Sequence, residues 1–321
     1  MQAANIQRVA CVGSGVIGTS WALNFAWKGR EVWIYDIGEA QLQAARAALK
    51  ENLDTMKSFR LVDESECRQI QERIHYTTEM AQAVKHAQFV QESGPESYEI
   101  KQKILAQMEE VLPADTVIAS STSGLLITKI AAGAKHPERI VGGHPYNPPH
   151  LIPLVEIVRG EQSADEAVTC AFEFYRALGK EPVVLNKEIS GFIANRLQVA
   201  VYREAIDLVV NGVCSLEDTD KALLWGPGIR WGIMGPNLIF HLGAGEAGLG
   251  TMLERQREST NLRLSQMADW KEMPQAFIDQ ADAGIAEEIA HLPTDMGKTI
   301  PELIKYRDAM LIELLRLHHK L

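Results

Sequence analysis

The sequence predicts an α/β fold, in which a doubly wound sheet of mostly parallel strands is followed by an all-helical domain. Up to residue 185, short apolar runs alternate with helical patterns, and this repeated β-α order is typical of a doubly wound sheet. After residue 189 the strand signals stop, and amphipathic helical patterns continue to the end of the chain. We therefore expect a first domain at residues 1–189 and a second at residues 190–321.

The composition is that of a globular protein with a sizeable core. The chain has 321 residues, 46% of them hydrophobic, and its net charge of -10 argues against nucleic acid as a partner. No apolar run reaches the roughly 18 residues that a membrane span needs, and the first residues lack a signal-peptide pattern. The four cysteines are widely spaced and form neither a disulfide nor a metal pattern. We expect reduced thiols in a cytoplasmic protein that holds no metal.

The first elements occur in the order of a dinucleotide-binding unit. An apolar strand at Arg8–Val12 runs into residues 13–18, which match the pattern G-x-G-x-x-G. A helical pattern follows at residues 19–28, and a second strand at Glu31–Tyr35 ends in Asp36. A glycine triplet alone is weak evidence, but here the strand, glycines, helix, second strand and terminal acid all follow in order. This arrangement predicts a Rossmann-type nucleotide site.

The glycines of this motif have distinct physical roles. Gly13 permits a tight turn, Gly15 lets the backbone approach a pyrophosphate, and Gly18 lets the helix pack close to the sheet. The N–H groups at the start of the helix, near Val16 and Ile17, are expected to bind the phosphates.

Asp36 distinguishes between two nucleotides. Its carboxylate can accept both ribose hydroxyls and would repel a 2'-phosphate, and the following Ile37 and Gly38 supply no arginine to offset that repulsion. We therefore expect NAD rather than NADP. The alternative is a Rossmann-like protein whose glycine turn binds no cofactor.

The next segment brings two charged residues to the same edge of the sheet. Its expected elements are a helical pattern at residues 39–72, strands at residues 75–77 and 88–92, and helices at residues 79–86 and 98–111. Glu96 follows the second of these strands, and Lys101 lies in the last helix. Because ligands bind at the carboxyl ends of parallel strands, both are candidate cofactor contacts. An ordinary surface ion pair is the alternative.

Three further strands end in a serine, a histidine and a carboxylate. The strands are expected at residues 116–119, 140–143 and 154–158. Ser123 follows the first and His144 the second, and the third turns back after a proline-rich corner, so that Glu156 approaches His144. Histidine exchanges a proton near neutral pH, and a carboxylate at its second nitrogen fixes the tautomer and stabilises the imidazolium. The pattern therefore predicts a general base.

The remaining elements complete the sheet and form the helical domain. They are a helix at residues 164–178, a strand at residues 182–185, and helices at residues 192–210, 216–224, 236–253, 274–290 and 300–317. Asn195 lies in the first turns of the first of these later helices. Asn195 could make a purely structural bond there, and Ser123 could cap a helix that begins near Leu125.

Five motifs resemble the L-3-hydroxyacid and L-3-hydroxyacyl-CoA dehydrogenase family over essentially the whole chain. They are residues 12–18, 120–123, 144–149, 154–156 and 191–196. The resemblance implies an active site of Ser123, His144, Glu156 and Asn195, with NAD as cofactor and a homodimer formed through the helical domain. His144 would take the proton of an alcohol at C3 of a small acid, and Ser123 and Asn195 would hydrogen-bond the reacting oxygen. We place Ser121 among the cofactor contacts.

Within that family the match leans away from the CoA-using members, because Ser121 stands where they typically have asparagine. Residues 228–235 look like the carnitine and L-gulonate branches, and Arg230 with Trp231 looks closest to the carnitine branch. The implied substrate is a small 3-hydroxy acid, with carnitine first and L-gulonate or 3-hydroxybutyryl-CoA as alternatives. The implied substrate contacts are Ser123, Tyr146, Asn195, Arg230 and Trp231.

Three alternatives stay open. Phe192 and Glu246, with Tyr146 and Trp231, are further candidates for holding a trimethylammonium group, although buried aromatic residues usually belong to a core. Arg230 could instead form a salt bridge to one of the many acids. A protein of another class, a non-catalytic structural protein like the lens crystallins of this family, would keep the fold without turnover.

Overall fold

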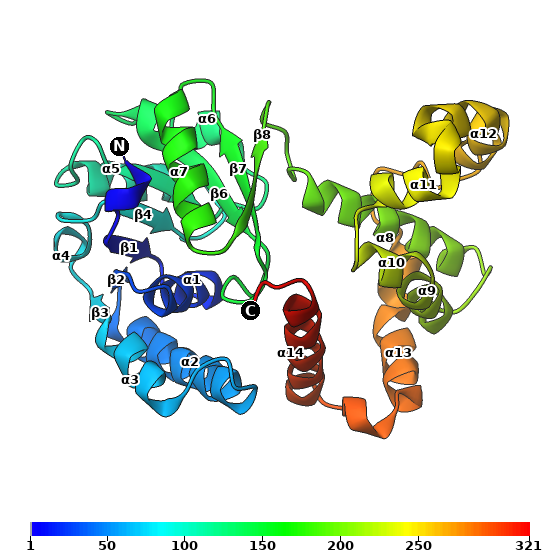
Figure 1. Cartoon of the computed structure of the whole chain (residues 1–321), viewed down its shortest axis with the longest axis horizontal. Helices are drawn as coiled ribbons and strands as arrows, with labels where there is room; N and C mark the ends of the chain where they lie inside the picture. The colour runs from blue at the N-terminus through cyan, green and yellow to red at the C-terminus, as the bar shows by residue number, and fades with distance from the viewer. Residues whose placement is uncertain (1) are drawn as a thin grey trace. The chain divides into compact units, whose positions relative to one another are not determined.

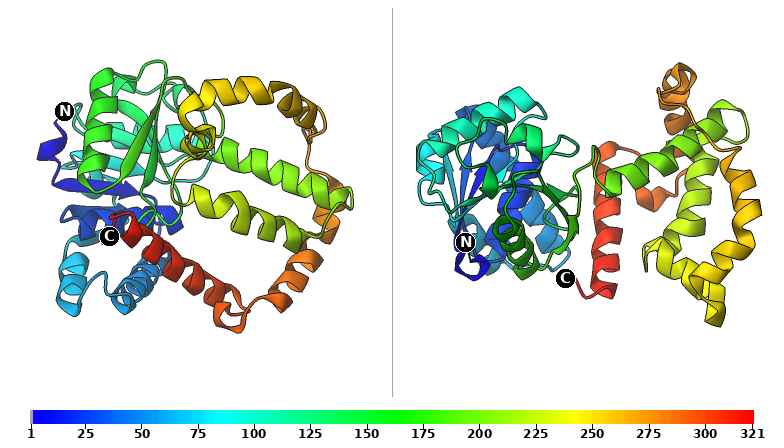
Figure 2. Two further views of the ribbon diagram at one scale, coloured as in Figure 1. Left: turned by 45° about the vertical axis from the view of Figure 1, so that its right-hand side comes forward. Right: turned by 90° about the horizontal axis from the view of Figure 1, so that it is seen from above.

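The computed structural model describes residues 2–321, which form two compact units. One unit contains the residues up to Arg196 together with Lys320, and the other contains Leu197–His319 together with Leu321. The first unit holds the sheet and the second is built from helices, as Figures 1 and 2 show. None of the helices in residues 2–321 is both long and apolar enough to cross a membrane.

The sheet has eight strands in the order β3-β2-β1-β4-β5-β6-β7-β8. They are β1 (Arg8–Val12), β2 (Glu31–Tyr35), β3 (Ile74–Thr77), β4 (Phe89–Glu92), β5 (Val117–Ser120), β6 (Ile140–Pro145), β7 (Leu154–Arg159) and β8 (Glu181–Leu185). Strands β1 to β6 are parallel, β7 pairs with β6 antiparallel, and β8 pairs with β7 in parallel. The predicted doubly wound, mostly parallel sheet is confirmed, including the turned-back strand that carries Glu156.

Helices cover both faces of the sheet (Figure 1). They are α1 (Val16–Trp27), α2 (Glu39–Ser58), α3 (Glu64–Glu72), α4 (Met80–Val84), α5 (Tyr98–Glu109), α6 (Ile127–Ile130) and α7 (Asp165–Ala177), with the short 3-10 turns η1 (Ala3–Asn5) and η2 (Pro137–Arg139). Alternate side chains of β1 point to opposite faces. Val9 and Cys11 belong to the core that contains α1, α2 and α7, and Ala10 and Val12 to the core that contains α4, α5 and α6.

Aromatic packing fixes α1 and α7 on one face of the sheet. Trp21 and Phe25 stack at 5.2 Å, Trp21 contacts Tyr175 at 5.4 Å, and Phe89 of β4 meets Phe174 at 4.7 Å between ring centroids. All five rings are fully buried. Such pairs contribute about 0.5–1.5 kcal/mol each beyond the area they bury. The packing therefore fixes the position of α1 relative to the sheet. The N-terminus of α1 follows the glycine turn.

The helical unit differs from its prediction at one point. Its elements are α8 (Ala194–Val210), which begins in the sheet unit, α9 (Leu216–Leu223), the π-helical η3 (Leu224–Gly228), α10 (Ile229–Trp231), α11 (Pro236–Ala244), the 3-10 turn η4 (Gly245–Ala247), α12 (Gly248–Leu264), α13 (Gln275–His291), the 3-10 turn η5 (Thr294–Met296) and α14 (Ile300–Leu317). The single helix predicted at residues 236–253 is wrong. The chain breaks at Gly245 and Gly248, whose φ angles are +59° and +78°, and α12 then continues to Leu264.

The helical pattern predicted at residues 39–72 is also interrupted. Helix α2 ends at Ser58, and Arg60 adopts a left-handed φ of +57°. Helix α3 then begins with a capping box, in which the Asp63 carboxylate accepts from the Glu66 N–H and the Glu66 carboxylate accepts from the Asp63 N–H. Two helices therefore replace the continuous one.

Candidate active site

The carboxyl ends of the central strands form one row of residues at the edge of the sheet. Val12 pairs with Glu92, Glu92 with Ser120, and Ser120 with Gly142. The Ser93 N–H donates to the Val12 carbonyl and the Ser121 N–H to the Glu92 carbonyl, each at 2.7 Å. The connections from β1 and β4 lead to opposite sides of the sheet, and such a switch point is where doubly wound sheets bind ligands.

The glycine turn after β1 excludes side chains at two positions and leaves space at a third. Gly13 has φ +101°, and a Cβ there would lie 2.6 Å from the Ser93 carbonyl oxygen. A Cβ on Gly18 would lie 1.9 Å from the Gly13 carbonyl oxygen. A Cβ on Gly15 would meet nothing within 4 Å. The turn is therefore closed towards the sheet and open in front of α1, whose first residues are Val16 and Ile17. This open space at a helix N-terminus fits a pyrophosphate.

Asp36 closes this nucleotide site at the end of β2. Its Oδ2 accepts from the N–H and the hydroxyl of Ser14, each at 2.7 Å, and its Oδ1 accepts from the Ile37 N–H at 2.8 Å. Both lone pairs of Oδ2 are therefore used by Ser14, while Oδ1 keeps one lone pair. The part of the chain that the structure describes places no lysine or arginine within ion-pair distance of Asp36. The site therefore fits a ribose hydroxyl, as in NAD, and disfavours a second phosphate.

The ion pair considered for Glu96 and Lys101 is present, with 3.9 Å between Nζ and Oε2, but it is not an ordinary surface pair, because the lysine is buried. Lys101 is 1% exposed and donates to both oxygens of Glu92 at 2.9 Å and to the Gly94 carbonyl at 3.1 Å. The Glu92 carboxylate also accepts from the Ser120 hydroxyl at 2.5 Å and the Gly94 N–H at 2.6 Å. A buried cation is tolerated when it is paired and hydrogen-bonded in this way. Lys101 holds the loop after β4, and its direct contact with a cofactor stays a prediction.

Glu96 organises the turn that follows β5. One oxygen, Oε1, accepts from the Thr122 hydroxyl at 2.7 Å, the Ser123 N–H at 2.9 Å and the Gly124 N–H at 3.2 Å. The Ser123 hydroxyl lies 3.2 Å from the same oxygen. Ser123 is not the cap of a helix near Leu125, because it is the Thr122 hydroxyl that accepts from the Leu125 N–H, at 3.0 Å.

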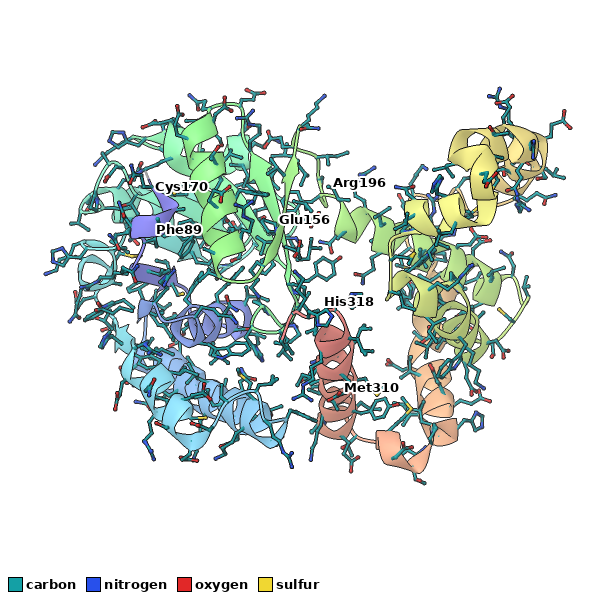
Figure 3. The ribbon with its side chains drawn as sticks, viewed as in Figure 1. Phe89, Glu156, Cys170, Arg196, Met310 and His318 are labelled. Atoms are coloured by element: carbon teal, nitrogen blue, oxygen red, sulfur yellow. The ribbon has the colours of Figure 1, made fainter. Side chains whose placement is uncertain are left out.

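His144 and Glu156 form a buried pair across β6 and β7. The two residues are register partners, and Nδ1 of His144 lies 2.9 Å from Oε2 of Glu156. Glu156 is 0% exposed and His144 is 6% exposed, and Figure 3 shows Glu156 within the sheet. The imidazole ring also makes edge-type contacts with Tyr146 and Phe192, at 5.7 and 5.5 Å between centroids. The carboxylate and these two rings fix the imidazole, and none of residues 2–321 hydrogen-bonds its Nε2.

The second oxygen of Glu156 is held by the start of α8. Its Oε1 accepts from the N–H groups of Ile193 and Ala194 at 2.8 and 3.0 Å. The turn that presents these groups contains Phe192, a buried residue with a left-handed φ of +51°. Burial raises the pKa of Glu156, but the hydrogen bonds from His144, Ala194 and Ile193 together outweigh it, so the net pKa lies below the ordinary value. The carboxylate therefore stays ionised beside the imidazole.

Asn195 connects two of the other predicted site residues. Its Oδ1 accepts from the Tyr146 hydroxyl at 2.9 Å, and its Nδ2 donates to the Ser123 carbonyl at 3.1 Å. Because the amide nitrogen carries two protons, one remains for a ligand. The structure therefore brings Ser123, Tyr146 and Asn195 into one network beside the His144–Glu156 pair.

Two family models match this chain. The NAD-binding domain of 3-hydroxyacyl-CoA dehydrogenase matches residues 8–189, and the C-terminal domain of 3-hydroxyacyl-CoA dehydrogenase matches residues 191–280. The chain belongs to the 3-hydroxyacyl-CoA dehydrogenase family. It is accordingly an NAD-dependent dehydrogenase of hydroxyl groups, and the predicted cofactor is confirmed.

Relatives within this family and beyond it align along nearly the whole chain. An L-carnitine dehydrogenase of Streptomyces griseus is 39% identical over 97% of this chain and 90% of its own, and one of Pseudomonas aeruginosa is 36% identical over 97% and 93%. A solved structure of an NAD+-dependent 5-formyl-3-hydroxy-2-methylpyridine 4-carboxylic acid 5-dehydrogenase has a TM-score of 0.80 at 27% identity, covering 98% and 97%. The structure of FadB2 of Mycobacterium tuberculosis has a TM-score of 0.71 at 31% identity, covering 87% and 94%.

The substrate contacts predicted in the helical domain are not part of this network. Arg230 and Trp231 lie on α10 and Glu246 on η4, and all three are exposed. In the described residues Arg230 makes no ion pair, so the salt bridge considered for it is not formed. Phe192, by contrast, is fully buried against His144 and belongs to the core. Contacts of Arg230 and Trp231 with substrate stay predictions.

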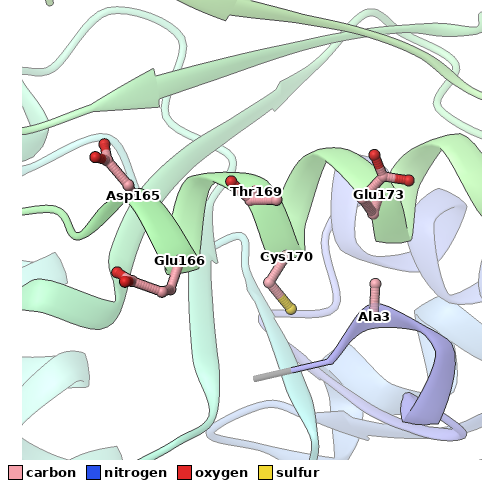
Figure 4. A pocket seen from close by; sticks show the side chains of 6 residues that line it. All are labelled: Ala3, Asp165, Glu166, Thr169, Cys170 and Glu173. Atoms are coloured by element: carbon pink, nitrogen blue, oxygen red, sulfur yellow. The ribbon is translucent and has the colours of Figure 1, made fainter.

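Residues that the sequence did not single out complete the hydrogen-bond network around the predicted site residues. Glu92 neutralises Lys101, Thr122 caps the turn after β5, and Gln91 lies buried beneath Ser121. A glutamate and a glutamine in an otherwise apolar strand were the available signal, because such polar groups are buried only with partners. A separate surface pocket of about 330 Å³, lined by Ala3, Asp165, Glu166, Thr169, Cys170 and Glu173 (Figure 4), contains none of the predicted site residues.

Proposed function

We propose that the protein oxidises the C3 hydroxyl of L-carnitine to 3-dehydrocarnitine with NAD. The observation that carries the proposal is the His144–Glu156 pair at the nucleotide edge of the sheet. The substrate is suggested by several relatives named L-carnitine dehydrogenase, which are 33–39% identical over nearly the full chain. The residue roles and the substrate contacts are part of this proposal.

The chain's own residues account for the proton. NAD supplies the hydride acceptor when it is bound. The Nε2 of His144 accepts the hydroxyl proton, while Nδ1–H donates to Glu156, which stabilises the imidazolium that results. The free Nδ2 proton of Asn195 is a donor for the reacting oxygen. The Ser123 hydroxyl, which donates to Oε1 of Glu96 in this structure, would become a second donor by turning from Glu96 to the substrate. Burial of the pair excludes water from the carboxylate and strengthens its interaction with the imidazole.

A panel of four substrates tests the proposal. NADH formation is measured with L-carnitine, L-gulonate, 3-hydroxybutyrate and 3-hydroxybutyryl-CoA under the same conditions. We expect kcat/KM for L-carnitine to be at least about tenfold higher than for the other three compounds. A site that binds the polar groups of its own substrate discriminates against analogues that lack those groups. NADH from the CoA ester alone would overturn the substrate assignment. No turnover with any member of the panel would also contradict the proposed substrate.

We also propose a homodimer formed through the helical domain. The helices of this unit expose large apolar side chains that a monomer leaves in water: Leu197, Val199 and Tyr202 on α8 and Leu238, Phe240 and Leu242 on α11 are each at least half exposed. Exposed apolar surface of this extent marks an interaction site. All four cysteines are free thiols, which supports the cytoplasmic location we assign.

Light scattering after gel filtration tests the homodimer. We expect a mass twice that of one chain for the wild type. The double variant Leu197→Asp, Val199→Asp places charges at two exposed apolar positions of α8 and should shift the protein towards the monomer, because each charge buried in an interface costs several kcal/mol. Val111→Asp changes an exposed apolar residue of the sheet unit and serves as the control. A wild-type protein that is monomeric at micromolar concentration contradicts the proposal.

A further inference from the structure

A buried hydrogen-bond network lies directly beneath the nucleotide edge, centred on Gln91 in β4. The Gln91 side chain is 0% exposed. Its Oε1 accepts from the Tyr175 hydroxyl at 2.6 Å, and its Nε2 donates to the Ser121 hydroxyl at 2.8 Å and to the Gly143 carbonyl at 3.2 Å. Both N–H donors of the amide group and one of the two lone pairs of its oxygen are therefore used.

The partners of Gln91 determine which way its amide group is oriented. The Gly143 carbonyl can only accept, so the amide nitrogen of Gln91 must face it, and the amide oxygen must face Tyr175. The hydroxyl oxygen of Ser121 thus accepts a hydrogen bond from Nε2–H of Gln91 and lies 2.8 Å from the Ser93 hydroxyl. Whichever of the two serines donates to the other, one O–H is left over. The network therefore presents one oriented hydroxyl donor outside itself.

Both ends of the network touch parts of the site described above. The carbonyl of Ser93 bounds the space around Gly13, and its Cβ bounds the space around Gly18. Gly143 immediately precedes His144, and a Cβ on Gly143 would lie 2.3 Å from the Tyr175 hydroxyl oxygen. Gln91 thus joins the glycine turn, the end of β5 and the strand that carries the imidazole.

We propose that Gln91 is a positioning residue for the cofactor, which acts by orienting the Ser121–Ser93 hydroxyl pair as a hydrogen-bond donor to an oxygen of bound NAD. The Tyr175 hydroxyl, which donates to Oε1 of Gln91, sets the orientation of the Gln91 amide. The residue touches no reacting atom, so its effect on the cofactor passes through Ser121. This inference rests on the proposed NAD-dependent function and concerns the cofactor alone.

A double-mutant cycle on NADH affinity tests the proposal. The Kd for NADH is measured by fluorescence titration for the wild type, Gln91→Met, Ser121→Ala and the double variant. Losing one oriented neutral hydrogen bond should raise Kd about three- to tenfold on Gln91→Met in the wild-type background. In the Ser121→Ala background the same change should alter Kd less than about twofold, because the hydroxyl through which Gln91 acts is already absent. Equal fold-changes in both backgrounds, or no change in either, overturn the proposal.

A matched control separates positioning from general destabilisation. Thr116 is a buried residue at the amino end of β5, whose hydroxyl donates to the Ala87 carbonyl at 2.9 Å. Thr116→Val should lower the melting temperature and leave Kd for NADH unchanged; a rise equal to that of Gln91→Met overturns the proposal. If Gln91→Met does not fold, Tyr175→Phe takes its place in the cycle, with the same pattern expected. Carnitine turnover is scored separately, so an enzyme with another substrate can still show the cycle.

Discussion

Replacing His144 with glutamine is expected to lower kcat for carnitine oxidation about 10²- to 10⁴-fold, the usual contribution of a positioned general base. Glutamine has a similar reach but cannot take up a proton at neutral pH. The Kd for NADH should stay within about twofold, since the imidazole is not part of the glycine turn. The measurement is steady-state NADH formation together with fluorescence titration of NADH. A variant that turns over at the wild-type rate would refute the assignment of His144 as the base.

A second buried histidine provides the control. His150 is 6% exposed, as His144 is, and its Nδ1 lies 2.8 Å from the Ser20 hydroxyl. His150→Gln removes a buried imidazole from the same unit and should lower the melting temperature while keeping kcat within several-fold of the wild type. A loss of kcat as large as that of His144→Gln would mean that burial of an imidazole, and not proton transfer, explains the effect.

Replacing Glu156 with glutamine is expected to lower kcat about 10²- to 10⁴-fold through the tautomer of His144. The amide oxygen can still accept from Ile193 and Ala194, so the start of α8 keeps its bonds. The amide nitrogen then faces Nδ1 of His144 and donates to it, which moves the ring proton to Nε2. An imidazole protonated at Nε2 cannot accept the substrate proton. A kcat within threefold of the wild type would contradict the role of the pair.

The same variant changes the dependence of stability on pH. The pKa of Glu156 is lowered in the folded state, so its contribution to the free energy of unfolding is present above the ordinary glutamate pKa of about 4.3 and is lost as the pH falls through the lowered value. In urea unfolding, the difference between wild type and Glu156→Gln should therefore shrink as the pH drops below about 4.3. A difference that is constant from neutral pH down to that range would show that ionisation of Glu156 does not stabilise the fold.

The nucleotide site and the His144–Glu156 pair could be predicted because the residues of each motif lie close together in the sequence. The glycine turn and Asp36 follow their strands within one β-α-β unit, and His144 and Glu156 are both at strand ends separated by one short corner. The alternation of strands and helices predicted a mostly parallel sheet but not the order of its strands. Antiparallel pairing of β7 was predictable because the proline-rich corner leaves room only for a reversal.

The partners of Gln91 could not be predicted, because they depend on which strands become neighbours: Ser121, Gly143 and Tyr175 come from other strands and helices of the sheet unit. Glu92 is only nine residues from Lys101, but the fold of the loop between them decides whether the two side chains meet. The break in the helix after Ala244 was missed for a different reason. Glycine within an apolar pattern is compatible with either a continued helix or a left-handed turn, and only packing decides.

The proton-transfer pair depends on strand register as much as on residue identity. Glu156 faces His144 because of the number of residues between β6 and β7, and its neighbours Val155 and Ile157 point to the opposite face. A shift of this pairing by one residue would bring an aliphatic side chain opposite the imidazole, although His144 and Glu156 would both still be present in the sequence. Activity would then be lost through the alignment of two strands, without a change in either side chain.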